Sequence, residues 1–255
     1  MQTDRVESPN FNARRHALDM LVLHYTGMES GEAALQRMCD PAAEVSAHYM
    51  VWEDGRITQL VQEDQRAWHA GVSRWQDDDD LNSRSIGIEI VNGGHDVPLP
   101  DGRLPPYPDA QIAAVIALSK DILTRHAIRP SRIVGHSDIA PARKIDPGEH
   151  FPWDRLAAEG VGYWPDLPAM SGRDGGSLLP GDTGKHVERL QNALNGIGYE
   201  LAVDGIYSDE TASIVRAFQR RWLPMRLTGH AGAGTLARIA QIHAGLEAPS
   251  VSLSS

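Results

Sequence analysis

Short apolar segments alternate with amphipathic ones along the first 165 residues, and this alternation constrains the fold more than any other feature. Residues 19–26 (DMLVLHYT) and 85–91 (SIGIEIV) are typical of buried strands, and residues 108–127 have the periodicity of an amphipathic helix with Asp109 near its start. The same reasoning predicts a helix at 31–40, a hairpin at 46–61 with its turn at Asp54-Gly55, a strand at 132–139 and a helix at 152–160. Alternating strands and helices predict an α/β fold in which helices cover a sheet.

Two segments of this region show no regular pattern. Residues 92–108 (NGGHDVPLPDGRLPPYP) are so rich in glycine and proline that they predict a loop. The acidic run at 77–80 (DDDD) is most simply a solvated loop, because consecutive carboxylates repel one another. A metal site in that run is the weaker alternative.

The remainder of the chain has a different texture. Residues 166–177 lack periodicity and predict a linker between a first domain at 1–165 and a second, smaller domain. Gly181, Gly205 and Gly229 recur at a fixed spacing, and apolar positions come after each at a constant offset. This repeat predicts a small three-helix domain at 178–245, with helices at 187–198, 209–222 and 232–243 and a flexible tail at 246–255.

Composition excludes several classes of function. The net charge of -10 disfavours nucleic acid as a partner, since phosphate binding needs a basic surface. No apolar run approaches the roughly 18 residues of a membrane span. The N-terminus shows no signal peptide, which favours the cytoplasm, with the periplasm as the alternative if a leader was removed. The chain has a single cysteine, Cys39, which excludes an intrachain disulfide and is expected to be a small buried residue. Nothing in the sequence indicates the oligomeric state.

Three residues far apart in the sequence fit a metal site when taken together. His24 and His136 each lie in a predicted strand, and Asp146 precedes Pro-Gly. Alone, each imidazole is more often structural, and an Asp in this position often only starts a turn. Two imidazoles and one carboxylate are, however, the protein ligands of a catalytic zinc, whose fourth position is left to water.

Two further residues fit catalysis at such a site. Glu89 alternates with isoleucines in its strand, and a carboxylate there is costly unless it is paired or used. It is predicted to be the general base, with a buried ion pair as the alternative. Lys144 stands two residues before Asp146 and could stabilise an oxyanion, with an exposed lysine as the alternative.

Five separated motifs carry a family resemblance. LVLHYTG, SAHYMVWEDG, AWHAGVS, SIGIEI and GHSDIAPARKIDPG, in this order, resemble the zinc-dependent N-acetylmuramoyl-L-alanine amidases of the AmpD-like type (amidase type 2) over residues 9–160. The resemblance implies one Zn²⁺ per chain held by His24, His136 and Asp146, with Glu89 activating water and Lys144 stabilising the transition state. It also implies a mixed central sheet flanked by helices, as in peptidoglycan recognition proteins.

The resemblance also implies a set of substrate-binding residues. These are Trp68, His69, Asn82 and Arg143, of which the arginine suits a carboxylate because its guanidinium binds bidentately. His48 recurs in the family and is interpreted as structural or groove-lining. The acidic run before the Glu89 strand and the loop at 93–108 depart from the family pattern and bear on specificity.

The second region resembles another family. Residues 181–222, and above all DGIYSDETASIVRAFQ, resemble the three-helix peptidoglycan-binding domain type 1. Such a domain would raise the local concentration of the enzyme on its polymer. The alternative is a helical domain that only packs against the first.

These resemblances imply hydrolysis of the amide bond between N-acetylmuramic acid, ordinary or 1,6-anhydro, and the L-alanine of peptidoglycan stem peptides. The expected partner is therefore peptidoglycan or a muropeptide. A non-catalytic peptidoglycan-binding protein is one alternative, although such a relative is expected to lack one of the three metal ligands. A stem-peptide endopeptidase is the other.

Overall fold

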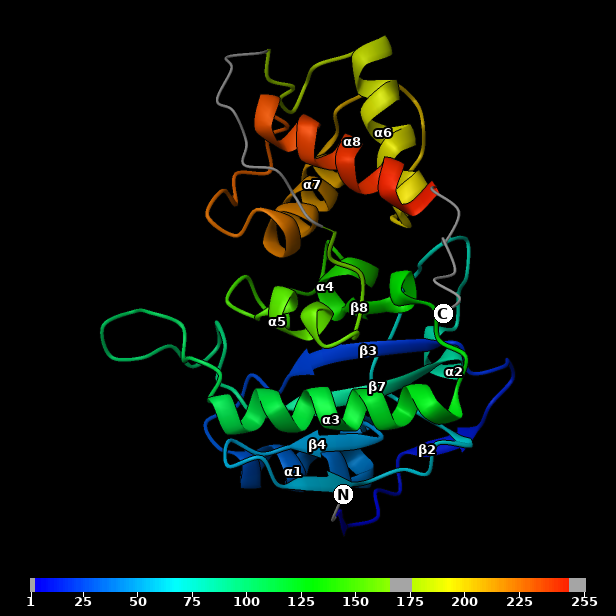
Figure 1. Cartoon of the computed structure of the whole chain (residues 1–255), viewed down its shortest axis with the longest axis vertical. Coiled ribbons are helices and arrows are strands. Elements are labelled where there is room, and N and C mark those ends of the chain that lie inside the picture. The colour runs from blue at the N-terminus through cyan, green and yellow to red at the C-terminus, as the bar shows by residue number, and fades with distance from the viewer. Residues whose placement is uncertain (1–2, 166–175, 248–255) are drawn as a thin grey trace, which may run out of the picture. The chain divides into compact units, whose positions relative to one another are not determined.

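The computed structural model of the chain describes residues 3–165 and 176–247, and they form two compact units (Figure 1). Of these residues, 3–74 and 78–164 belong to the first unit, and 75–77, 165 and 176–247 belong to the second. Apart from residues 176–177 and 246–247, the predicted linker and tail lie outside the described residues.

The first unit is built on a six-stranded sheet with the strand order β1-β5-β4-β7-β3-β8. Its strands are β1 Asp4–Arg5, β3 Met20–Tyr25, β4 Tyr49–Val51, β5 Ile57–Gln59, β7 Ser85–Ile90 and β8 Ile133–Gly135. Two short strands, β2 Phe11–Ala13 and β6 Gln65–Ala67, form a separate antiparallel pair. Only β4 and β5 run antiparallel within the large sheet, and the predicted hairpin joins them. The sheet is mixed, which confirms the predicted fold class.

The helices of this unit are α1 Gly31–Cys39, η1 Pro41–Ala43, α2 Leu81–Arg84, α3 Asp109–Arg125, η2 Pro130–Arg132, α4 His136–Ile139 and α5 Trp153–Ala158. The long helix α3 begins at Asp109, as predicted. The predicted strand at 132–139 was wrong in its second half. It ends at Gly135, and α4 begins at His136, because the side chain of Asp138 accepts a hydrogen bond from the backbone N–H of Gly135 and caps a helical turn there (2.9 Å).

One face of the sheet is covered by α3. Because side chains alternate along a strand, Leu21 and Leu23 of β3 point to this face, together with the isoleucines of β7. They pack against the apolar face of α3, formed by Ile112, Val115, Leu118 and Ile122. This cluster is the main core of the unit.

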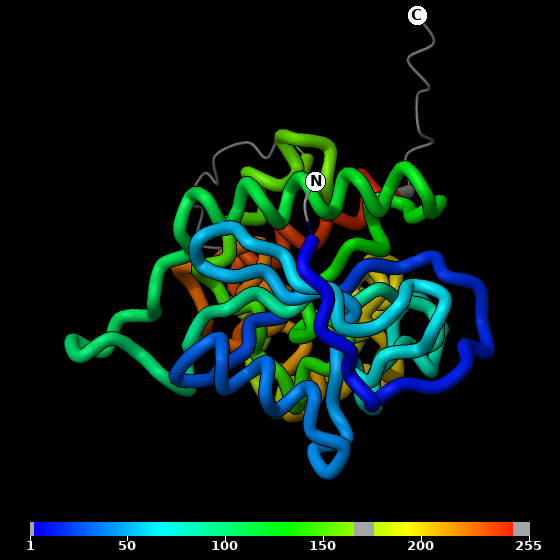
Figure 2. Tube along the Cα trace, turned by 90° about the horizontal axis from the view of Figure 1, so that it is seen from below, coloured from blue at the N-terminus to red at the C-terminus, as the bar shows by residue number. Residues whose placement is uncertain are grey.

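The other face is covered only in part by α1. Figure 2 shows α1 and α3 on opposite sides of the strands. Met38 of α1 packs with Met50 and Trp52 in a second apolar cluster, and Cys39 packs at its edge, half-buried rather than buried as expected. The part of this face that carries Glu89 lines a cavity instead.

The second unit contains α6 Lys185–Ile197, α7 Asp209–Trp222 and α8 Ala233–Glu247, which confirms three helices near the predicted positions. Its repeat has a visible basis. The buried Gln191 accepts a hydrogen bond from the backbone N–H of Gly205 (2.9 Å), and the buried Gln219 accepts the equivalent bond from Gly229 (2.9 Å). Both glycines have positive φ, which a turn at these positions requires. Helix α6 thus holds the turn before α7 by a hydrogen bond, and α7 holds the turn before α8 in the same way.

Among the residues that the structure describes, no helix is both long enough and apolar enough to cross a membrane.

Candidate active site

The candidate residues meet where three parallel strands end. β7, β3 and β8 lie side by side, and His24 is paired directly with Glu89 across β3 and β7. Gly135, the last residue of β8, is paired with Leu23, so His136 emerges next to His24. Sites in α/β sheets form outside the carboxyl ends of strands, where loops from several strands converge.

Three side chains converge on one point at this edge. Nδ1 of His24 lies 3.0 Å from Nδ1 of His136 and 3.0 Å from Oδ2 of Asp146. Nδ1 of His136 lies 3.1 Å from Oδ2 of Asp146, so the three atoms form a triangle. Tetrahedral ligands about 2.0–2.1 Å from a zinc ion are about 3.3–3.4 Å apart, so the triangle has nearly the required size. All three residues are buried, and their atoms form the one such group among the described residues.

The backbone explains how Asp146 returns to the two histidines. Its carbonyl accepts a hydrogen bond from the N–H of Ser137, just after His136 (2.8 Å). The next carbonyl, that of Pro147, accepts from the buried hydroxyl of Tyr107 (2.7 Å). A side chain at Gly135 would come 2.7 Å from Cδ of Pro147, so glycine is needed for this close approach.

The electrostatic state of the triangle suits a cation. Burial, followed by the proximity of His136, lowers the pKa of His24 to about 4, so this imidazole is neutral near pH 7. Burial would raise the pKa of Asp146, but His136 and His24 outweigh it and lower that pKa well below its usual value. Neutral imidazole and ionised carboxylate are the forms that bind metals.

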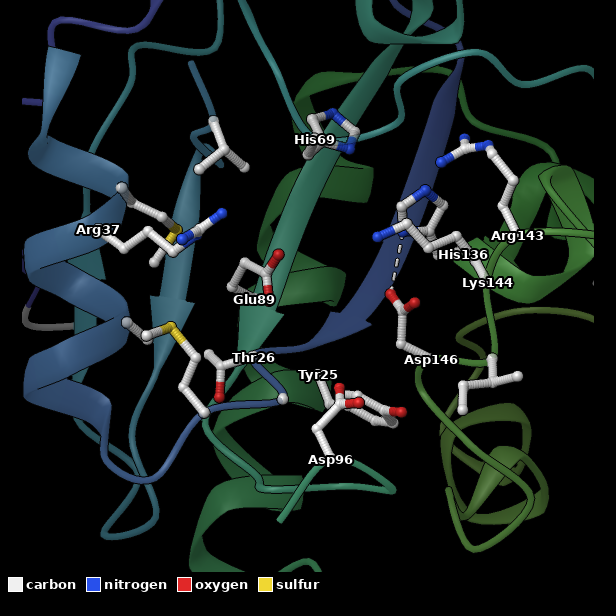
Figure 3. Close-up of a pocket in the computed structure, with 16 residues that line it drawn as sticks. Tyr25, Thr26, Arg37, His69, Glu89, Asp96, His136, Arg143, Lys144 and Asp146 are labelled. Atoms are coloured by element: carbon white, nitrogen blue, oxygen red, sulfur yellow. Dashed lines mark hydrogen bonds and ion pairs between the residues drawn. The ribbon is translucent and has the colours of Figure 1, made fainter. Parts of the chain in front are cut away.

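A cavity of about 620 Å³ opens beside the triangle. Arg37 of α1 stands on one side and Asp146 on the other, with Glu89 on β7 between them (Figure 3). Lys144 and Arg143 also line it, and their roles toward substrate stay predictions. The cavity therefore joins the triangle of His24, His136 and Asp146 to Glu89 and several charged groups.

Glu89 has the environment of a proton acceptor. Its Oε2 is buried and has no hydrogen-bond partner. Burial raises the pKa of Glu89 well above its usual value, the carboxylate of Asp146 adds to this, and Lys144 opposes it. A carboxylate that is desolvated in a cavity takes up a proton more readily than one in water.

The other predicted substrate residues lie in different surroundings. Trp68 is partly exposed, donates its Nε1–H to Oδ1 of Asn12 (2.9 Å) and does not line this cavity. Asn82 is buried, and its Oδ1 accepts the backbone N–H groups of His69 (2.9 Å) and Ala70 (2.7 Å). Their role toward substrate stays a prediction.

Arg143 and His48 also have defined partners. Nη2 of Arg143 donates to the carbonyl oxygens of Ala70 (3.2 Å) and Val72 (2.5 Å), which fixes its guanidinium at the wall of the cavity. His48 is fully buried, and its Nδ1 accepts the backbone N–H of Gly87 (2.9 Å). The structural interpretation of His48 thus agrees with its surroundings.

Several cavity residues carried no signal in the sequence. Arg37 is one of many exposed helix residues, and only the packing of α1 brings it to the cavity. Asp96 belongs to the glycine- and proline-rich loop and also lines the cavity. His95 anchors this loop, because its ring contacts the hydroxyl of Tyr25 (3.1 Å) and the carboxylate of Glu149 (3.1 Å).

Comparison with known proteins agrees with this geometry. The family model described as N-acetylmuramoyl-L-alanine amidase matches residues 14–149, and a peptidoglycan binding domain model matches residues 183–239. The chain is 38% identical to the N-acetylmuramoyl-L-alanine amidase AmiD of Escherichia coli over 86% of this chain and 80% of that protein. It is 35% identical to the 1,6-anhydro-N-acetylmuramyl-L-alanine amidase AmpD of Haemophilus influenzae over 59% of this chain and 88% of that protein.

Two solved structures are similar along nearly the whole chain. One is E. coli AmiD in complex with anhydro-N-acetylmuramic acid-L-Ala-D-γ-Glu-L-Lys, with a TM-score of 0.76, 35% identity and 92% of both chains covered. The other is AmpDh3 of Pseudomonas aeruginosa, with a TM-score of 0.74, 30% identity, and 95% of this chain and 99% of that chain covered.

Proposed function

The chain belongs to the N-acetylmuramoyl-L-alanine amidase family, and from that premise we propose how its own side chains carry out the reaction. It hydrolyses the amide bond between N-acetylmuramic acid and the L-alanine of peptidoglycan stem peptides. One observation supports the proposed mechanism above all others. His24, His136 and Asp146 converge within about 3 Å of one another, and Glu89 is paired with His24 on the neighbouring strand.

The triangle fits a single zinc ion. It offers two imidazole nitrogens and one carboxylate oxygen, which match the ligand types of catalytic zinc sites. A zinc ion held there supplies a Lewis acid that polarises the amide carbonyl and lowers the pKa of a coordinated water to about 7. His136 and Asp146 also line the cavity, which would leave room for water and substrate beside the ion.

Glu89 moves the protons of the reaction. As the water oxygen bonds to the amide carbon, Glu89 accepts a proton from that water, which its raised pKa favours. It then gives the proton to the nitrogen of L-alanine as the C–N bond breaks. The products are the lactyl carboxylate of the sugar and a peptide with a free amino terminus. Lys144 lines the same cavity, and its ammonium group stabilises the negative charge that develops on the amide oxygen.

Charged groups around the cavity suit the substrate class. The stem peptide carries free carboxylates, and the fixed guanidinium of Arg143 is a suitable partner for one of them. The relatives act on, or were solved with, 1,6-anhydro-muramyl peptides, so we propose that this chain accepts that form as well.

The second unit is proposed to hold the enzyme on polymer. Its helices match the peptidoglycan binding model, and a second binding event on the same chain raises the effective concentration of the first. This effect increases turnover of intact wall but not of small soluble muropeptides.

Digestion of a purified muropeptide tests the function. Incubation of anhydro-N-acetylmuramyl tripeptide with the full chain and zinc is expected to release an intact peptide that begins with L-alanine, identified by mass spectrometry. A shorter peptide would instead indicate an endopeptidase, and unchanged substrate would indicate a binding protein. The Asp146→Ala variant serves as the matched control, because it removes a ligand and leaves the rest of the cavity.

A further inference from the structure

The Nε2 atoms of His24 and His136, which face away from the triangle, both contact one short segment at residues 69–70. Nε2 of His24 lies 3.0 Å from Nδ1 of His69, and Nε2 of His136 lies 3.1 Å from the carbonyl oxygen of Ala70. Residues 69 and 70 are adjacent, and Asn82 fastens both through their backbone N–H groups. This segment therefore supports the two imidazoles from behind.

A chain of hydrogen bonds behind His24 has only one consistent direction. The hydroxyl of Ser85 lies 2.6 Å from the carbonyl oxygen of Leu81, which can only accept, so the single hydroxyl proton points there. Ser85 Oγ then accepts from Nε2–H of His69 (3.2 Å). A neutral imidazole carries one N–H, so Nδ1 of His69 has a lone pair and accepts from Nε2–H of His24.

The direction of this chain reaches the metal-type triangle. When Nε2 of His24 holds the proton, its Nδ1 carries a lone pair, and Nδ1 is the atom that faces Asp146 and His136. The carbonyl of Leu81, acting through Ser85 and His69, thus selects the tautomer of His24 that has its proton on Nε2. This tautomer leaves Nδ1 able to bind a metal.

The surroundings of His69 are built for its ring. A Cβ atom at Gly87 would lie 2.5–2.6 Å from three atoms of that ring, so the glycine in SIGIEI makes room for an imidazole. The backbone of Gly87 requires no positive φ, which leaves the ring as the reason for glycine at this position. His69 is 5% exposed, and both of its ring nitrogens have partners within the protein.

We propose that His69, with Ser85 behind it, is a positioning residue that holds His24 in its metal-binding tautomer and orientation. The inference rests on the proposed zinc site and assigns to His69 a task other than substrate binding. Outer-shell partners of this kind typically change metal affinity by about 10–100-fold when they are removed.

Zinc affinity of four variants of the full chain tests the proposal, by competition with a chromogenic chelator. His69→Ala is expected to raise the dissociation constant for zinc about 10–100-fold. His69→Asn places an amide oxygen near the position of Nδ1 and is expected to recover most of this loss. Ser85→Ala changes the packing least and is expected to weaken zinc binding by a smaller factor than His69→Ala.

His48→Ala is the matched control, because it removes a neighbouring buried imidazole whose ring centroid lies 5.7 Å from that of His69 and which does not contact His24. Thermal unfolding of the metal-free variants reports the loss of stability separately. We expect His48→Ala to lower the unfolding temperature while the zinc dissociation constant stays within about threefold of that of the unaltered chain.

A second readout concerns the proton itself. In the zinc-loaded chain labelled with ¹⁵N-histidine, the Nε2–H of His24 is expected to exchange slowly with water, and His69→Ala is expected to expose it to rapid exchange. Equal zinc affinity in His69→Ala and the unaltered chain, or an equal loss in His48→Ala, would overturn this inference alone. An unaltered chain that binds no zinc would overturn the proposed function and this inference with it.

Discussion

Replacing Glu89 by glutamine separates proton transfer from metal binding. The two side chains have the same shape, but the amide cannot accept a proton from water or return it to the leaving amine. General acid–base catalysis by a placed side chain typically contributes about 10²–10⁴ in rate, which corresponds to about 2.7–5.5 kcal/mol of activation free energy. We expect Glu89→Gln to lower kcat by a factor in this range.

The structure also predicts what Glu89→Gln leaves unchanged. Glu89 contributes no atom to the triangle of His24, His136 and Asp146, so the variant should bind zinc with the affinity of the unaltered chain. Its Oε2 has no hydrogen-bond partner, so glutamine breaks no bond there. The variant should therefore fold as well as the unaltered chain.

A second partly buried glutamate of the same unit provides the control. Glu63 is bonded to Arg125, His126 and Tyr49 and does not line the cavity of the active site. Glu63→Gln is expected to lower stability and leave kcat unchanged. Release of the stem peptide from a muropeptide, measured by chromatography, gives kcat, and elemental analysis gives the zinc content. Full turnover by zinc-loaded Glu89→Gln would refute the assignment of the base, and loss of zinc would refute the separation of roles.

Three further changes test what holds the fold together. Burial raises the pKa of Glu63, but its hydrogen bonds to Arg125, His126 and Tyr49 outweigh this and lower that pKa to about 2. The stabilisation from the ionised carboxylate is therefore present above about pH 4.3, is lost as the pH falls toward 2, and amounts to about 2 kcal/mol after allowance for solvent screening. Urea unfolding of the unaltered chain and of Glu63→Gln at pH 7 and pH 3 measures it. Gln219→Ala leaves the backbone N–H of Gly229 without its buried acceptor and should destabilise the second unit by about 1–3 kcal/mol, seen as a lower unfolding temperature, whereas an unchanged temperature would contradict the role of the repeat. Gly135→Ala brings a methyl group to 2.7 Å from Pro147, so we expect weaker zinc binding through displacement of Asp146, and unaltered affinity would show that the loop yields without cost.

The sequence allowed the arrangement of the strand residues to be predicted. Alternation in β3 and β7 placed His24 and Glu89 opposite the apolar residues of their strands, and the structure adds that they are direct neighbours in the parallel register. The mixed sheet, the long helix at Asp109 and the three helices of the second unit were predicted from periodicity or resemblance in the same way. These features are local, or depend on a pattern that repeats along one element.

Features that depend on contacts between distant segments could not be predicted. The helix that begins at His136 depends on the capping bond between Gly135 and Asp138, and the sequence HSDI alone does not reveal that bond. The return of Asp146 to the histidines depends on a loop whose path is set by Gly135 and Pro147. The contact of His69 with His24 joins residues 45 positions apart, and Gly87 shows its purpose only when the ring above it is seen.

Metal analysis of the purified chain tests the central claim most directly. Elemental analysis combined with X-ray absorption should find one zinc per chain, with two imidazole nitrogens and a carboxylate oxygen in its coordination shell. Asp146→Ala should lose that ion. A chain that remains free of zinc at saturating concentration, or a variant that keeps the same coordination shell without Asp146, would contradict the account.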